Sequence, residues 1–403
     1  MRRPSPRWQR ILVLAGLGAG ALGIALFQGA LSTPARVESL YTTGIYPLVV
    51  RVFSFLSGLV PFSLAELFVA AAALFVIGRV TWRFTGRFRQ PAPSGEVPTG
   101  EPQTPARPPA PRAVLRRLAY TAVFALASAG ALYAIFVVVW GLNYARPRLE
   151  HRLNLPVGQI SEAELVRLTT RVAAETTRFH RLAGLPAAAV SKSPLDFATL
   201  STAIDEAYDA VDLPGDPGPG RMSPVKPAVF SGLMSRLGIS GIFVPFTGEP
   251  TVNTGPPDVA VAFTAAHEKA HQRAITHEGE ASFAAYLALS RQRRHPYLSY
   301  AASFYAARHL LAAVRNADAE DRDRAWAALG PGPRRDLDAL NAFWAQHRGM
   351  VRGAARRVND SYLRTMRIPD GARSYGTVVR LLIADLRQRS APPAAIATDD
   401  SEG

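Results

Sequence analysis

The sequence predicts a mainly α-helical membrane protein, in which three N-terminal transmembrane helices precede a predominantly helical domain with a small β-sheet. Three observations support this prediction. The chain has 403 residues, of which 48% are hydrophobic and only 19% are charged, whereas soluble domains average about 25% charged residues. Uncharged runs long enough to cross a bilayer lie within the first 142 residues. The remainder shows mostly helical periodicity, with one short β-type run.

Three segments of the N-terminal region are predicted to span the membrane. Residues 11–31 and 118–142 contain no charged side chain, and each run exceeds the roughly 20 residues that cross the hydrocarbon core as a helix. Residues 62–82 form the remaining span, which is apolar except for Glu66 and Arg79. Residues 1–142 are therefore interpreted as the membrane region.

Two stretches near the N-terminus have a second interpretation. Thr33-Pro34-Ala35 loosely resembles a small-residue cleavage site, so the first span could be a cleaved signal peptide, although its apolar run is long for one. Residues 45–59 are also apolar but contain Pro47 and Arg51. These two residues favour an interfacial or packed helix over a fourth span.

The distribution of arginine predicts the orientation in the membrane. The formal charge is +15, and residues 1–10 and 79–117 carry +10 of it next to the apolar runs. The positive-inside rule places the N-terminus and the 83–117 loop in the cytoplasm, so that three crossings leave everything after residue 142 outside. The expected location is the cytoplasmic (inner) membrane, with the lipid bilayer as partner. Only about +5 remains on the C-terminal domain, too little to favour a nucleic acid as partner.

Two segments are predicted to lack regular structure. Eight prolines lie between residues 91 and 111 within the cytoplasmic loop, a composition typical of a disordered or polyproline-like linker. Residues 391–403 are expected to be a disordered tail. The chain has no cysteine, which excludes disulfides, a thiolate nucleophile, and Cys-type zinc or iron–sulfur sites.

Residues 143–390 are predicted to form one extracytoplasmic domain. Ser161 and Glu164 are spaced as a capping box that begins a helix. Residues 241–246 form a short β-type run, and residues 259–276 return to helix. We expect helices to dominate from there to about residue 388.

The informative motif of this domain is His267-Glu268-Lys269-Ala270-His271, an H-E-x-x-H pattern. On a helix the two histidines lie one turn apart on the same side, so both imidazoles can reach one Zn²⁺. Glu268 is then placed to accept a proton from a zinc-activated water, as the catalytic base of a hydrolase. Lys269 is expected to point away from the metal side.

A third protein ligand is needed, because catalytic zinc commonly has three, and the sequence offers three candidates. Glu280 is favoured because the helix that it begins resembles the segment from which gluzincin-like peptidases supply a glutamate. His277 has the spacing of the metzincin pattern, but that pattern needs a turn with positive φ where Ala274 stands. Glu278 is the third possibility.

Several further segments, together with this motif, make the chain resemble a known family. They are Trp140–Tyr144, Leu237–Phe243, Pro245–Glu249, His267–Gln272, Glu278–Phe283, Val358–Leu363 and Ser374–Gly376. They resemble domain-of-unknown-function family 3810, bacterial membrane-anchored proteins with an H-E-x-x-H motif. The chain departs from the family pattern at Lys269, Ala274 and Ser282, and the last of these replaces the residue expected to orient a histidine.

The resemblance implies a zincin-like, membrane-tethered zinc metallopeptidase that acts on a peptide or protein substrate. A non-catalytic membrane scaffold or regulatory protein that keeps the fold is the alternative. The strand at 241–246 could hold a peptide by β-augmentation or lie buried in a small sheet. Glu249 could contact substrate or occupy a turn, and Tyr375 could donate to an oxyanion or lie in the core.

Overall fold

The computed structural model describes residues 6–85, 111–217, 222–290, 292–349, 352–353, 357, 361 and 375–390. The Pro-rich segment up to residue 110, the tail 391–403 and the 358–360 part of the family pattern lie outside these residues. Contacts divide the chain into two compact units. One consists of Met1–Thr33 and Leu64–Leu142, and the other of Pro34–Ser63 and Asn143–Gly403.

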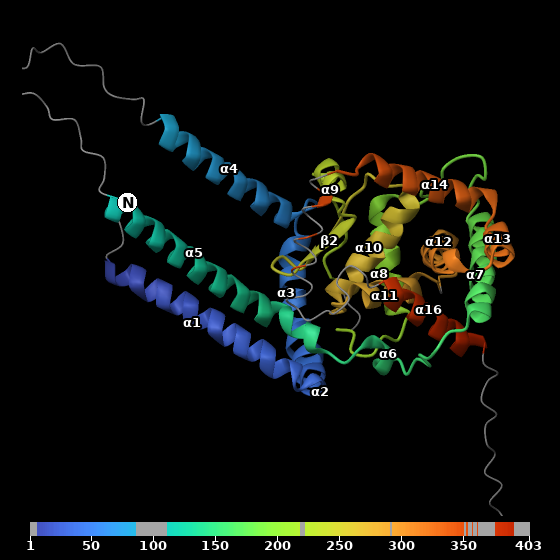
Figure 1. Ribbon diagram of the computed structural model, residues 1–403, viewed down its shortest axis with the longest axis horizontal. Coiled ribbons are helices and arrows are strands. Elements are labelled where there is room, and N and C mark those ends of the chain that lie inside the picture. The colour runs from blue at the N-terminus through green and yellow to red at the C-terminus, as the bar shows by residue number, and fades with distance from the viewer. Residues whose placement is uncertain are drawn as a thin grey trace, which may run out of the picture. The chain divides into compact units, whose positions relative to one another are not determined.

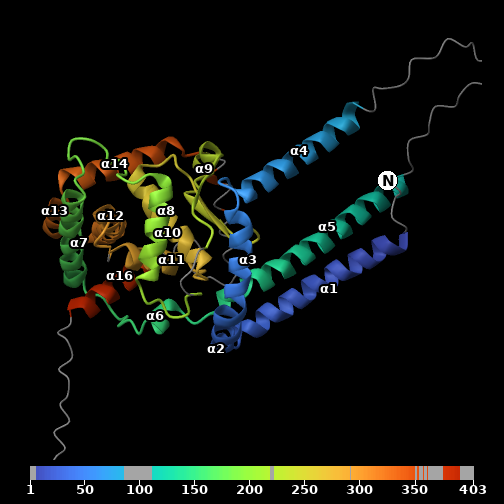
Figure 2. The same ribbon diagram turned by 180° about the vertical axis from the view of Figure 1, so that it is seen from behind.

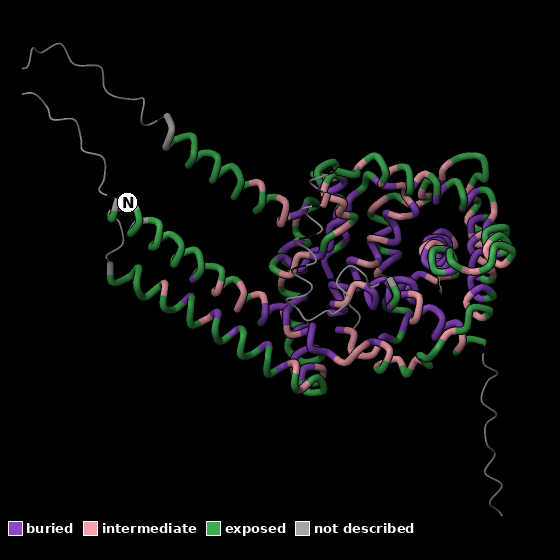
Figure 3. Tube along the Cα trace, in the orientation of Figure 1, coloured by how far each residue is buried: buried purple, intermediate pink, exposed green. Residues whose placement is uncertain are grey.

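The first unit contains the three long apolar helices that the sequence predicts. They are α1 (Pro6–Leu31), α4 (Leu64–Thr85) and α5 (Pro111–Val139). Their apolar side chains are largely exposed, and α4 is drawn in green along almost its whole length (Figure 3). Exposed apolar surface on this scale suits contact with lipid rather than water. All three helices are long and apolar enough to cross a membrane.

Glycines allow α1 and α5 to pack closely against each other. A Cβ added to Gly20 would lie 2.8 Å from the Cα of Gly130, and one added to Gly16 would lie 2.5 Å from the carbonyl oxygen of Ala127. Gly16 and Gly20 are four residues apart and therefore share one helix face. This small-xxx-small spacing is typical of transmembrane helix pairs.

A fourth segment, Pro34–Gly58, also meets the length and composition of a membrane span. It comprises α2 (Pro34–Arg36), the π-helix η1 (Val37–Ile45) and α3 (Tyr46–Gly58). Unlike the other three, it belongs to the unit that contains the C-terminal domain. The Tyr46 hydroxyl donates to the carbonyl of Gln272 (2.8 Å), and the Gln272 side chain donates to Ser54 Oγ (3.2 Å). These contacts support the packed helix expected for residues 45–59.

The second unit is mainly helical, and its core lies around two helices that are apolar on nearly all sides. Every residue of α11 (Glu278–Ser290) from Gly279 to Leu289 is buried. Helix α12 (Pro296–Ala313) lies among α7 (Glu162–Leu182), α10 (Asp258–Gln272) and α16 (Tyr375–Ser390) and is seen end-on in both ribbon views (Figures 1 and 2). A helix that is apolar all round is a core helix.

The remaining elements cover this core. They are η2 (Gly141–Ala145), α6 (Leu149–Arg152), α8 (Phe197–Asp209), α9 (Ser231–Leu237), η3 (Val314–Asn316), α13 (Ala319–Ala328) and α14 (Pro331–Gln346). The predicted capping box is confirmed at α7, where the backbone N–H of Glu164 donates to Ser161 Oγ (3.3 Å). This bond satisfies one of the N–H groups that a helix leaves unpaired at its start.

A three-stranded sheet of order β1-β3-β2 lies beside α10. β1 (Lys226–Pro227) runs parallel to β3 (Glu249–Val252), and β2 (Gly241–Val244) runs antiparallel to β3. The β-type run predicted at 241–246 thus forms a strand, and that strand occupies an edge of the sheet. An edge strand leaves one row of backbone groups unpaired within the sheet.

Glu249 has neither of the roles expected from the sequence, because it is fully buried in an ion pair. Lys226 Nζ lies 2.8 Å from Glu249 Oε2, and Ser63 Oγ donates to Oε1 (2.8 Å). Lys226 also donates to the carbonyls of Ser57 (2.6 Å) and Phe62 (2.8 Å). One buried ammonium group therefore joins residues 34–63 to the sheet.

We expect Lys226→Met to lower the free energy of unfolding by about 3 kcal/mol, because it leaves the Glu249 carboxylate buried without its cation. Adding Glu249→Met should recover most of this loss, since no charge then stays buried. Denaturant unfolding of the full chain measures both. Lys192→Met is the control, because Lys192 is exposed and pairs loosely with Asp258 (3.5 Å). Equal losses in the Lys226 and Lys192 variants would contradict the assignment.

Candidate metal centre

Helix α10 places the two histidines of the motif side by side. His267 and His271 lie one turn apart, and their rings are perpendicular with centroids 4.7 Å apart. The helix is buried along most of its length, and the small Ala266 and Ala270 let neighbouring elements approach its backbone closely. The motif is thus held rigidly in the core, with 15% of the His267 side chain still exposed.

Glu278, the first residue of α11, completes a cluster with these histidines. Its Oε2 lies 3.1 Å from His267 Nε2, and its Oε1 lies 3.7 Å from His271 Nε2. One donor atom from each of the three residues lies within 4.8 Å of the other two. Burial raises the pKa of Glu278, but hydrogen bonds from both histidines outweigh it and hold that pKa well below its usual range.

The Nδ1 atoms of both histidines are engaged away from the cluster. His271 Nδ1 lies 2.7 Å from the carbonyl oxygen of Ile275, which can only accept, so Nδ1 donates there and Nε2 is the ring nitrogen that faces Glu278. His267 Nδ1 lies 3.0 Å from Ser282 Oγ, which accepts a hydrogen bond from the Tyr305 hydroxyl (3.0 Å). Such partners orient imidazole ligands at metal sites. Ser282 therefore occupies the orienting position, despite its departure from the family pattern.

Glu280, the ligand favoured by the sequence, is not part of this cluster. Its Oε1 lies 2.7 Å from Arg148 Nε, and its side chain is almost fully buried. Burial raises the pKa of Glu280, and Arg148 and Arg152 oppose that rise. The carboxylate is thus committed to an arginine that precedes α6. Of the three sequence candidates, Glu278 is the one whose carboxylate meets both histidines.

The expectation that Ala274 would prevent a turn with positive φ is wrong. Ala274 has φ 64°, and its carbonyl accepts a hydrogen bond from Arg146 Nη1 (2.8 Å). The turn nevertheless does not bring His277 into the cluster. Arg148 Nη1 lies 3.2 Å from His277 Nδ1, and the ring meets Tyr144 edge-on. The turn instead places the next residue, Glu278, beside His267 and His271.

Glu268 lies under the edge strand of the sheet. Burial raises its pKa, while the two histidines and a backbone hydrogen bond from Phe243 lower it. A Cβ added to Gly241 would lie 2.6 Å from Glu268 Oε1. Glycine at the start of β2 therefore lets this strand pass directly over the carboxylate.

Lys269 points away from the cluster, as the sequence predicts. Its side chain is fully buried, and its Nζ lies 2.6 Å from Asp205 Oδ1 on α8. Arg273, one turn further on, is buried on the same side and pairs with Asp209 (3.2 Å) and Asp216 (3.0 Å). These cations hold α10 against α8 and do not reach the histidine face.

A protein-family model matches most of this chain. The protein-family model described as "Protein of unknown function (DUF3810)" covers residues 41–383. The chain belongs to this family. No curated protein and no solved structure matches it. The family description assigns no activity, so a function for this DUF3810 protein has to be argued from its site.

Sequence reasoning missed two residues of the DUF3810 site. Arg148 contacts both Glu280 and His277, yet nothing in its sequence context distinguishes it from other arginines. Tyr305 supports Ser282 from α12, 23 residues further along the chain. Tyr305 stacks on Phe263 at a centroid distance of 3.6 Å. The side chain of Tyr375, considered as an oxyanion donor, lies outside the described part of the chain.

We expect Ala274→Gly to stabilise this DUF3810 protein by about 1 kcal/mol, because alanine is strained at positive φ and glycine is not. The free energy of unfolding of the full chain measures the effect. Ala327→Gly on α13, where the alanine is exposed and helical, is the control and should destabilise by roughly 0.5–1 kcal/mol. A loss of stability in both variants would contradict the strained turn.

Proposed function

We propose that this protein is a membrane-anchored, zinc-dependent hydrolase that cleaves peptide bonds. In this proposal His267, His271 and Glu278 hold the zinc, and Glu268 is the general base. The observation that carries it is the convergence of two imidazole Nε2 atoms and one carboxylate while both Nδ1 atoms are held elsewhere. Histidines that only pack in a core have no need of this arrangement.

The residues present fit zinc. Two imidazoles and one carboxylate are a donor set found in catalytic zinc sites, where a fourth position stays open. The Glu278 carboxylate lies between the two Nε2 atoms, and its side chain is 43% exposed. Solvent can therefore reach this carboxylate. A zinc ion held there would act as a Lewis acid and make hydroxide available near neutral pH.

Glu268 supplies the proton transfer in this proposal. Its carboxylate accepts a proton from the attacking water at Oε1 or Oε2 and passes it to the leaving amine. Because burial raises its pKa, its basicity is better matched to this task than that of an exposed glutamate. Its hydrogen bond from the Phe243 backbone fixes the carboxylate against β2.

The edge strand β2 suits a peptide substrate. No strand lies beyond β2 in the described part of the chain, and Gly241 brings β2 directly over Glu268, which accepts a hydrogen bond from the Phe243 backbone. A peptide added alongside β2 would gain main-chain hydrogen bonds and lie next to the catalytic base. Ile242, a residue of β2 that is 46% exposed, offers the peptide an apolar contact.

The test is zinc content together with hydrolysis by the purified full chain. We expect one zinc per chain and cleavage of a mixture of quenched fluorescent peptides that stops when a chelator removes the metal. Zinc without cleavage of any peptide would favour the non-catalytic scaffold. Absence of zinc after purification in zinc-containing buffer would overturn the metal site itself.

We further propose that residues 143–390 lie outside the cytoplasm of a bacterial inner membrane, with the N-terminus inside. Arginine concentrates in residues 1–10 and 79–117, and the fourth apolar segment belongs to the C-terminal domain rather than to the unit that contains the other three. Three spans therefore fit better than four.

We expect a reporter that is active only outside the cytoplasm to be active when fused after residue 390 and inactive when fused at residue 100. The prediction follows because one proposed span, residues 118–142, separates residue 100 from residue 390 and puts the two fusions on opposite sides of the membrane. Activity of both fusions, or of the fusion at residue 100 alone, would show a different number of spans or the reverse orientation.

A further inference from the structure

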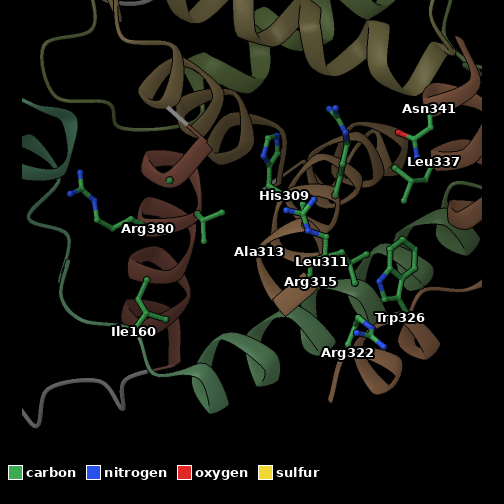
Figure 4. Close-up of a pocket in the computed structure, with 14 residues that line it drawn as sticks. Ile160, His309, Leu311, Ala313, Arg315, Arg322, Trp326, Leu337, Asn341 and Arg380 are labelled. Carbon is green, nitrogen blue, oxygen red and sulfur yellow. The ribbon is translucent and has the colours of Figure 1, made fainter. Parts of the chain in front are cut away.

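A cavity of about 680 Å³ lies where the C-terminal end of α12 meets α13, α14 and α16 (Figure 4). None of the residues that line it belongs to the metal cluster or to the sheet. Its volume falls within the range of about 300–1,000 Å³ that is typical of small-molecule sites. The cavity is thus large enough for a ligand of its own.

The charged side chains that line this cavity are all arginines. They are Arg308, Arg315, Arg322 and Arg380, and no aspartate or glutamate lines it. Arg380 is paired with Glu150 (2.7 Å), and Arg322 lies 3.6 Å from the exposed Asp323. Arg308 and Arg315 form no ion pair with any residue in the described ranges. Two guanidinium groups therefore face the cavity without a carboxylate partner there.

The rest of the wall is mostly apolar. Leu311, Leu337 and Val379 line it together with the indole of Trp326, which is 37% exposed. An indole face can stack on a planar ligand. Guanidinium groups bind carboxylates through two parallel hydrogen bonds. An apolar wall with two unpaired guanidinium groups suits a singly charged organic anion better than a small, multiply charged inorganic one.

We propose that this cavity binds a small organic carboxylate, with the carboxylate held by Arg308 and Arg315 and the apolar or aromatic body packed against Trp326. The site is separate from the proposed zinc centre and does not depend on it. The carboxylate would bind among helices α12, α13, α14 and α16, whereas a peptide substrate would lie along β2.

Equilibrium dialysis of naphthalene-2-carboxylate against the full chain in nanodiscs of zwitterionic lipid tests the proposal. Empty nanodiscs of the same lipid correct for partition into the bilayer. We expect saturable binding of one molecule per chain. Naphthalene-2-carboxamide, which has the same shape without the charge, should bind at least about tenfold more weakly, the effect of losing one charge-assisted hydrogen bond.

Two variants separate the charge of the cavity from its volume. Arg308→Gln/Arg315→Gln should weaken binding of the carboxylate at least about tenfold, and Ala312→Trp should abolish binding by filling the cavity, which Ala312 lines. Arg294→Gln removes an exposed arginine that does not line the cavity and should bind like the unaltered chain. Unchanged unfolding midpoints establish that the variants are folded.

Carboxylates also bind zinc, so the dialysis is repeated after treatment with a chelator. Binding that survives chelation and disappears in both cavity variants supports the proposal, whatever the outcome of the zinc experiments. Binding that disappears with the metal, equal affinity for the amide, or full binding in the cavity variants would overturn it. So would the absence of binding to the unaltered chain.

Discussion

Glu278→Ala is expected to weaken zinc binding by more than about 100-fold, because it removes one of the three groups that converge on the site. Even changes to residues that only orient zinc ligands typically cost roughly 10- to 100-fold, and Glu278 lies within 3.1 Å of a histidine Nε2. Competition with a chromophoric chelator measures the affinity on the full chain. Glu280→Ala is the matched control, since that glutamate lies in the first turn of the same helix and pairs with Arg148.

The comparison of these two variants separates two arrangements of the site. The structure predicts a large loss of zinc affinity in Glu278→Ala and a much smaller one in Glu280→Ala. His277→Ala should also keep zinc, because His277 contacts Arg148 and Tyr144 instead of the cluster. Tight zinc in Glu278→Ala with lost zinc in Glu280→Ala would restore the ligand favoured by the sequence pattern.

Glu268→Gln is expected to reduce the rate of peptide hydrolysis by about 10² to 10⁴ while zinc stays bound, the usual scale for removing a general base. Glutamine keeps the size of the side chain and can still meet the Phe243 backbone, so the fold should not change. The rate is measured with a quenched fluorescent peptide that the unaltered chain cleaves, and zinc content is measured on the same sample. Glu320→Gln, an exposed change on α13, is the control.

Two outcomes would contradict the role of Glu268. Loss of zinc as complete as in Glu278→Ala would make Glu268 a ligand rather than a base. An unchanged rate with zinc bound would mean that another group moves the proton.

Local patterns in the sequence were enough to predict much of this molecule. The positions of the apolar helices α1, α4 and α5 follow from long apolar runs with at most two charged residues, and the placement of His267 and His271 follows from helical spacing. The apolar helices and the placement of the two histidines both depend on residues that are close together in the sequence, so a single sequence is enough to predict them. The direction of Lys269 was predicted for the same reason, since two residues on a helix turn a side chain to another face.

The carboxylate that meets the two histidines could not be predicted in this way, because it depends on the path of the chain between α10 and α11. Ala274 adopts the turn that its side chain disfavours, and the Arg146 hydrogen bond to its carbonyl helps to hold it there. Glu278 and Glu280 lie only two residues apart in one helix. Arg148 pairs with Glu280, and Glu278 is the one that meets the histidines. The contact with Arg148 joins residues more than 100 positions apart in the sequence.

Pro47 and Arg51 favour a packed or interfacial helix at residues 45–59, but the sequence does not indicate that residues 34–63 belong with the C-terminal domain. Their composition is that of a span, and only distant partners such as Lys226 and Gln272 show that they pack in the domain. Glu249 likewise has no local signal that distinguishes a buried ion pair from a turn. Contacts between remote segments leave little trace in a single sequence.

The buried bonds from Lys226 to the carbonyls of Ser57 and Phe62 have a consequence for how the molecule is made and destroyed. Residues 34–63 leave the ribosome long before Lys226 does, and they lie between the apolar helices α1 and α4 in the chain. The domain therefore cannot finish folding until translation has passed α5 and the last helices of the domain. The same contacts bear on proteolytic release, since a protease that cuts once after residue 142 frees a fragment that lacks the two carbonyls to which its buried Lys226 donates. Release of an intact domain would take a cut on each side of residues 34–63 as well.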